Sequence, residues 1–134
     1  LAATFAPFVA PMAALADGRP RRLVGIASVA GIRGLPGAAA YSASKAAVIG
    51  YTKALAKEVA PSGIRVNCIA PGVVDTEMNG ALGQEVMDQL REETPLCTIG
   101  TPQQIAQVSL FLAGEQASFV TGQVISPNGG FFCC

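Results

Sequence analysis

A serine, a tyrosine and a lysine in the first third of the chain are the residues whose types and spacing could do chemistry. Ser28 follows an apolar run at residues 22–27 that is typical of a buried strand, and a helix is expected to begin near residues 39–40. Tyr41 and Lys45 are four residues apart, so on this helix they lie on one face, one turn apart. Ligands of open α/β sheets bind beyond the carboxyl ends of the strands, and we expect the three side chains to converge there.

These three groups suit proton transfer to an oxygen atom. A free tyrosine hydroxyl, with a pKa of about 10, is a poor acid or base at neutral pH. The ammonium of Lys45 and the positive end of the helix would stabilise the phenolate form of Tyr41. Tyr41 could then exchange a proton with an alcohol or carbonyl oxygen, which Ser28 could hold by a hydrogen bond.

Three motifs, in order along the chain, carry a resemblance to a known family. Ser28 is followed thirteen residues later by Tyr41, and then by Ser-Ala-Ser and Lys45. Residues 67–76 read Asn-Cys-Ile-Ala-Pro-Gly-Val-Val-Asp-Thr, and residues 121–130 contain Thr-Gly-Gln and Asn-Gly-Gly. This ordered set resembles the short-chain dehydrogenase/reductase family, and within it the 3-oxoacyl-[acyl-carrier-protein] reductases most closely.

The resemblance implies a role for each of these residues. Tyr41 would donate the proton during reduction, Ser28 would orient the substrate carbonyl, and Lys45 would bind the nicotinamide ribose. The cofactor-binding residues would be Tyr41 and Lys45 together with four residues of a later loop: Pro71, Gly72, Val74 and Thr76. The implied cofactor is NADPH, with NADH as the alternative, because the residue that decides between them is not in this sequence.

The amino-acid composition excludes several other classes of chemistry and of partner. The 134 residues include no histidine, which excludes Ser-His-Asp, Cys-His and His-ligated metal chemistry, and we expect no metal site. Nine basic and nine acidic residues give a net charge of zero, so neither nucleic acid nor a membrane is expected as a partner. The four cysteines show no C-x-x-C spacing, which favours a reducing, cytoplasmic compartment.

The pattern of apolar and turn residues predicts strands that alternate with helices. Strands are expected at residues 22–27, 64–70 and 123–126, helices at 1–16, 40–60, 83–93 and 102–113, and a loop at 28–37. Thr101, Pro102 and Gln104 have the pattern of a capping box at the start of the last helix. Such alternation favours right-handed parallel crossovers and an α/β fold.

Two further segments predict how the protein associates with partners and how it encloses its substrate. The helix at 40–60 carries a face of small residues, namely Ala43, Ala47, Gly50 and Ala54, which would let another helix approach closely. The resembled family pairs this helix with the preceding one across a subunit interface, so we expect a homo-oligomer, a homotetramer by resemblance, through helices 1–16 and 40–60. Residues 76–96 would form a flexible flap, with an apolar wall made by Met78, Leu82, Val86 and Met87.

By the family's layout, residues 1–134 correspond to one partial catalytic domain. They would form the carboxyl-terminal half of a Rossmann-type doubly wound parallel sheet, with three strands and flanking helices. The family's glycine-rich phosphate loop and the asparagine of its catalytic tetrad have no counterpart in this sequence. We therefore interpret the chain as a fragment of a longer reductase.

Two classes of function remain open. The first is an NAD(P)H-dependent carbonyl reductase of fatty acid biosynthesis that acts on a 3-oxoacyl thioester of acyl carrier protein. Within this class, a sugar, a steroid or a protein-linked ketone are alternative substrates. The second is a non-catalytic, oligomerising module whose site is vestigial.

Overall fold

The structure, a computed structural model, describes residues 2–15, 19–80 and 82–133, so the ends of the predicted helix at 1–16 lie outside the described residues. The described strands form one parallel sheet in the order β1-β2-β3, with β1 at Arg21–Ile26, β2 at Ile64–Ile69 and β3 at Val124–Ile125. β1 and β2 pair in register along their whole length, and β3 joins β2 at its last two residues. The predicted α/β fold is confirmed.

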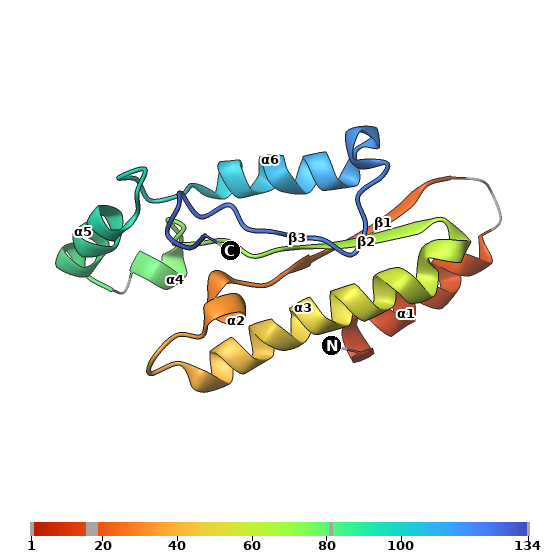
Figure 1. The fold of residues 1–134 in the computed structure, drawn as a ribbon, viewed down its shortest axis with the longest axis horizontal. Helices are drawn as coiled ribbons and strands as arrows, with labels where there is room; N and C mark the ends of the chain where they lie inside the picture. Colours follow the sequence, from red (N-terminus) through yellow and green to blue (C-terminus); the bar gives the residue numbers. More distant parts are fainter. Residues whose placement is uncertain (1, 16–18, 81, 134) are drawn as a thin grey trace.

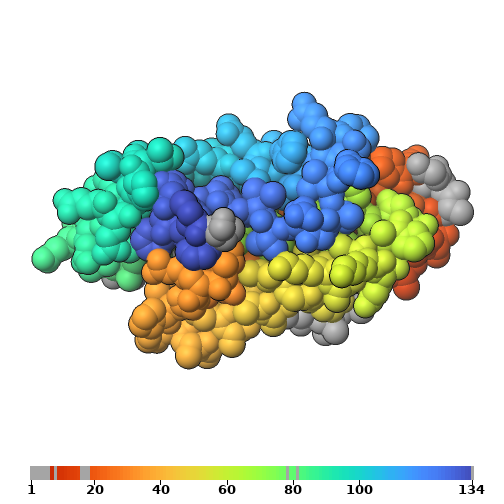
Figure 2. All heavy atoms as spheres, in the orientation of Figure 1, coloured from red at the N-terminus to blue at the C-terminus, as the bar shows by residue number. Residues whose placement is uncertain are grey.

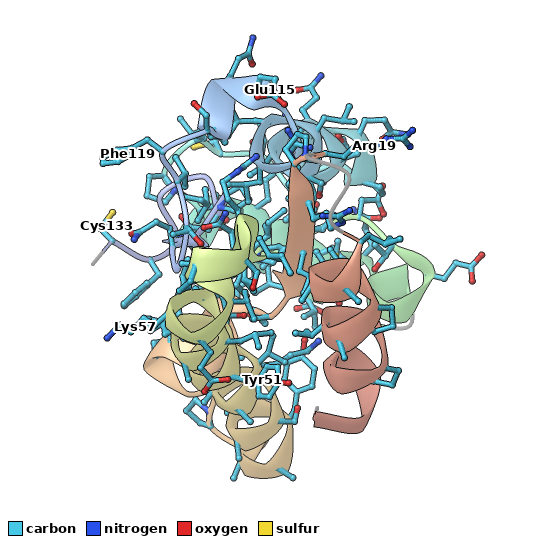
Figure 3. All side chains as sticks on the ribbon, turned by 90° about the vertical axis from the view of Figure 1, so that its right-hand side faces the viewer. Arg19, Tyr51, Lys57, Glu115, Phe119 and Cys133 are labelled. Atoms are coloured by element: carbon cyan, nitrogen blue, oxygen red, sulfur yellow. The ribbon has the colours of Figure 1, made fainter. Side chains whose placement is uncertain are left out.

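Helices cover both faces of this sheet (Figure 1). α6 (Pro102–Ala113) lies on one face, while α1 (Ala2–Ala14) and α3 (Ala39–Val59) lie on the other. On the α3 side, Leu55 and Val59 pack with Ile64 and Val66 of β2. Figure 3 shows Tyr51 between α3 and α1, and it packs against this cluster together with Val9 and Met12 of α1.

The shorter helices gather at the carboxyl ends of β1 and β2 (Figure 1). They are α2 (Val29–Arg33), α4 (Glu77–Gly80) and α5 (Gln84–Glu93); the turns η1 (Ala60–Ser62) and η2 (Glu115–Ala117) follow α3 and α6. The prediction of a loop at residues 28–37 is wrong in part, because this segment contains α2. Ser28 caps the start of α2 by accepting a hydrogen bond from the Ala30 N–H (3.2 Å), and Gly34, with φ of 75°, ends it.

Side chains cap both ends of α6 by hydrogen bonds to its terminal backbone groups. The predicted capping box is confirmed, since the Thr101 hydroxyl accepts from the Gln104 N–H (3.3 Å) and the Gln104 side chain accepts from the Thr101 N–H (2.8 Å). At the other end, Arg65 of β2 donates to the carbonyls of Leu112 (3.0 Å) and Gly114 (2.9 Å). These carbonyls are the unpaired, negative end of the helix, which a cation stabilises.

The two faces of α3 differ in their contacts. Thr52, Leu55, Ala56 and Val59 are buried against the sheet, whereas the small residues Ala43, Ala47, Gly50 and Ala54 are exposed. The small-residue face therefore does not pack onto the chain's own sheet. None of the helices in the described part of the chain has the length and apolar character needed to cross a membrane.

Candidate active site

Ser28 lies where β1 gives way to α2, next to the loop that follows β2. The Ala27 N–H donates to the carbonyl of Ile69 (2.7 Å), and the Val29 N–H donates to the carbonyl of Pro71 (3.0 Å). These two hydrogen bonds continue the pairing of β1 with β2 beyond the sheet. They place Ser28 beside Pro71 at the carboxyl edge, where α/β proteins bind ligands.

Gly31 sets the distance between α2 and α3. A Cβ atom at this position would lie 2.6 Å from the carbonyl carbon of Lys45 and 2.7 Å from the backbone nitrogen of Ala46, closer than non-bonded atoms can approach. Glycine therefore allows α2, which Ser28 caps, to lie directly against the part of α3 that carries Lys45. The contact fixes the serine relative to the tyrosine and lysine.

A pocket of about 370 Å³ opens at this edge, and Ser28, Tyr41 and Gly72 all line it. Its volume is in the range of pockets that bind small ligands. The rest of its described lining is mostly apolar: Val29, Ala30, Arg33, Leu35, Val73, Asn79, Leu82, Leu90 and Phe131. In Figure 2 the carboxyl-terminal segment, in dark blue, lies between the green and cyan surface of α4 and α5 and the orange surface of α2.

The phenol ring of Tyr41 lies beneath the ammonium of Lys45 and shares the pocket with Ser28. Tyr41 is 41% exposed. The Lys45 Nζ lies 5.6 Å from the centroid of that ring and 3.4 Å from the carbonyl oxygen of Ile26, to which it donates. The Ser28 hydroxyl accepts one hydrogen bond, from Ala30, and its own O–H can still donate to a ligand. Lys45 is not among the described residues that line the pocket, and its ammonium lies over the phenol ring.

The residues of the loop after β2 that the resemblance assigns to the cofactor do not all line the pocket. Gly72 lines the pocket and lies so close to Asn128 that a Cβ atom on it would be 2.7 Å from the Asn128 Cβ. Val74 instead forms a bridge to Gly100, and the Thr76 carbonyl accepts the N–H groups of Asn79 and Gly80 in α4. Neither Val74 nor Thr76 lines the described pocket.

The predicted apolar wall of the flap is only partly correct. Leu82 lines the pocket, but Val86 is 42% exposed and lies outside its described lining, and Met87 faces a neighbouring hollow. The side chain of Met78 lies outside the described residues. Leu90 contributes instead, because α5 turns its carboxyl-terminal half toward the pocket.

Two lining residues, Arg33 and Phe131, were not among the predicted site residues. Arg33 ends α2, and its guanidinium carbon lies 4.7 Å from the centroid of the Phe131 ring. Asn128 supports Phe131, since its carbonyl accepts the Phe131 N–H (3.0 Å) and its side chain donates to the carbonyl of Phe132 (2.7 Å). The signal available in the sequence was the Asn-Gly-Gly turn, which marks the bend that brings this segment back to the pocket.

The sequence of the chain also matches known proteins. A sequence model of the family described as enoyl-(acyl carrier protein) reductase matches residues 3–132. The chain is 48% identical over 112 residues to the 3-oxoacyl-[acyl-carrier-protein] reductase of Chlamydia muridarum, an alignment that covers 84% of this chain and 45% of the relative.

Two solved structures of related sequence also superpose on the chain. A 3-oxoacyl-[acyl-carrier protein] reductase from Brucella melitensis superposes with a TM-score of 0.88 at 37% identity, over 97% of this chain and 48% of that one. A short-chain dehydrogenase/reductase described as a glucose/ribitol dehydrogenase, also from Brucella melitensis, gives a TM-score of 0.81 at 42% identity, over 84% of this chain and 46% of that one. The chain belongs to the short-chain dehydrogenase/reductase family. It spans about half the length of these relatives and corresponds to their carboxyl-terminal portion.

Proposed function

We propose that this chain is the catalytic, carboxyl-terminal half of an NAD(P)H-dependent carbonyl reductase. The observation that carries the proposal is that Ser28 and Tyr41 line one pocket, with the Lys45 ammonium 5.6 Å from the centroid of the phenol ring. β1 pairs with β2 on one edge and with no other described strand, and its second edge could pair with a strand of a longer protein.

The three side chains divide the chemistry of carbonyl reduction between them. Ser28 donates a hydrogen bond to the substrate carbonyl oxygen and fixes its position in the pocket. Tyr41 donates its phenolic proton to the same oxygen, on which negative charge develops as the carbonyl carbon is reduced. Lys45 stabilises the phenolate that remains on Tyr41. A bound nicotinamide would supply the hydride that the carbonyl carbon accepts.

The backbone around the pocket suits a nicotinamide ring. The bridge between Val74 and Gly100 uses the carbonyl of Val73 and the N–H of Asp75, so it leaves the Val74 N–H to meet the carboxamide. The exposed Thr76 would reach the carboxamide or the pyrophosphate, and Pro71 and Gly72 would lie along the ring. Lys45 would donate to the ribose hydroxyls. We take NADPH as the cofactor, with NADH as the alternative.

A 3-oxoacyl thioester on acyl carrier protein is the substrate that the observations favour. The relatives are named for this substrate, and the mostly apolar lining of the pocket suits an acyl chain better than a sugar. The exposed small-residue face of α3 supports a homo-oligomer, in which α3 of one copy would pack against another.

The test is an assay of the complete protein that carries this sequence. With acetoacetyl-acyl carrier protein and NADPH, we expect NADPH to be consumed and a 3-hydroxyacyl product to form. A sugar, a steroid and a protein-linked ketone would be assayed in parallel to test substrate class. A protein that binds NADPH but reduces none of these ketones would contradict the proposed function and favour a vestigial site.

A further inference from the structure

Arg33 brings a positive charge to the pocket that the proposed reaction does not use. It is the only charged side chain among the described residues that line the pocket. No carboxylate in the described ranges forms an ion pair with it. Its guanidinium instead packs on the ring of Phe131, at 4.7 Å from the centroid, and Phe131 is itself held by the turn at Asn128.

We propose that Arg33 selects ketone substrates that also carry an anionic group, either a carboxylate or a phosphate. The inference rests on the proposed function, because Ser28 and Tyr41 define where the ketone oxygen lies. A guanidinium presents paired N–H donors that match the oxygens of both anions. Stacking on Phe131 restrains its plane before a ligand binds, so less side-chain entropy is lost on binding.

The position of Arg33 also indicates how far the anion lies from the reacting carbonyl. Ser28 caps α2 and Arg33 ends it, five residues later. A helix advances about 1.5 Å per residue, so the two positions are separated by roughly 7.5 Å along the axis. Because the arginine side chain adds its own length to this separation, we expect the anionic group of the substrate to lie several bonds or more from the ketone, at the end of an acyl chain or along a thioester arm.

The experiment compares three thioesters on the complete protein with NADPH. Acetoacetyl-N-acetylcysteamine is neutral, acetoacetyl-4′-phosphopantetheine carries a phosphate on the thiol side, and 3-oxoadipyl-N-acetylcysteamine carries a carboxylate at the end of the acyl chain. The measured quantity is kcat/KM of each anionic substrate divided by that of the neutral one. Arg33→Gln is the test variant, and Lys57→Gln, which removes an exposed charge at the far end of α3 (Figure 3), is the control.

We expect wild-type protein and the Lys57→Gln variant to prefer one anionic substrate by about 2- to 5-fold, a modest factor because Arg33 is exposed. Which of the two anionic thioesters is preferred shows whether Arg33 binds a phosphate on the thiol side or a carboxylate at the end of the acyl chain. The Arg33→Gln variant should bring the ratio close to one. Reduction of all three thioesters with the same ratio in wild type and Arg33→Gln would overturn this inference and leave the proposed function standing. Reduction of none of them by the wild-type protein would overturn both.

Discussion

Ser28 serves the structure and the proposed chemistry through the same oxygen. Its Oγ accepts the Ala30 N–H and so starts α2, and it also lines the pocket that Tyr41 shares. That Ser28 and Tyr41 would lie at one pocket could be predicted because they are near one another in sequence, at the boundaries of adjacent elements. Arg33 and Phe131 could not be paired in advance, because only the folded chain brings such distant residues together.

Cys68 gives a prediction at the scale of one residue. It is fully buried between Ala27 and Ala70, and burial raises the pKa of its thiol because the thiolate would lose its hydration. The folded pKa then exceeds the unfolded one, so the thiol's contribution to stability is complete below the unfolded pKa and is lost as pH rises through the folded pKa.

We therefore expect the urea midpoint of the wild-type protein to fall more steeply between about pH 8 and pH 10 than that of a Cys68→Ala variant. A Cys97→Ala variant, which removes an exposed thiol, should keep the wild-type pH slope. Equal slopes for wild type and Cys68→Ala would show that burial of this thiol is not linked to folding.

At the scale of elements, the longer helices and strands could be predicted from the sequence. Each is long enough to show a repeated pattern of apolar residues or recognisable start and stop residues. α6 has a capping box, and α3 ends near a Pro-Ser-Gly stop; both were predicted to within one residue. α2 was missed because five residues are too few to show a helical period and Gly31 in its centre disfavours a helix. Tertiary packing explains the glycine, because the backbone of Lys45 leaves no room for a side chain at position 31.

The contact at Gly31 can be tested directly. A Gly31→Ala substitution would force α2 away from α3, because the added Cβ meets rigid backbone, and it should lower the free energy of unfolding by about 1–3 kcal/mol. It should also lower kcat, since Ser28 would move relative to Tyr41. The matched control is Gly80→Ala at the end of α4, where the added Cβ meets no atom within 4 Å. A Gly31→Ala protein with wild-type stability and kcat would contradict this role of α2.

At the scale of the whole molecule, the exposed face of α3 predicts association. Ala47 lies in the middle of that small-residue face, and an Ala47→Arg substitution would place a charged, bulky side chain where a second helix is expected to pack. We expect light scattering of the complete protein to show a smaller oligomer for this variant. Gln89→Arg on the exposed side of α5 adds the same charge elsewhere and should leave the mass unchanged. An unchanged mass for Ala47→Arg would contradict an interface through α3.

The most direct test of the account is the Tyr41→Phe variant of the complete protein, which removes the phenolic oxygen and keeps the ring that lies beside Lys45. If the tyrosine hydroxyl donates the proton, the single-turnover rate of ketone reduction should fall by about 10²- to 10⁴-fold. The affinity for NADPH, measured by its fluorescence, should fall by no more than about 10-fold, the effect of losing one hydrogen bond. A variant that binds NADPH normally and reduces the ketone at close to the wild-type rate would contradict the proposed role of this pocket.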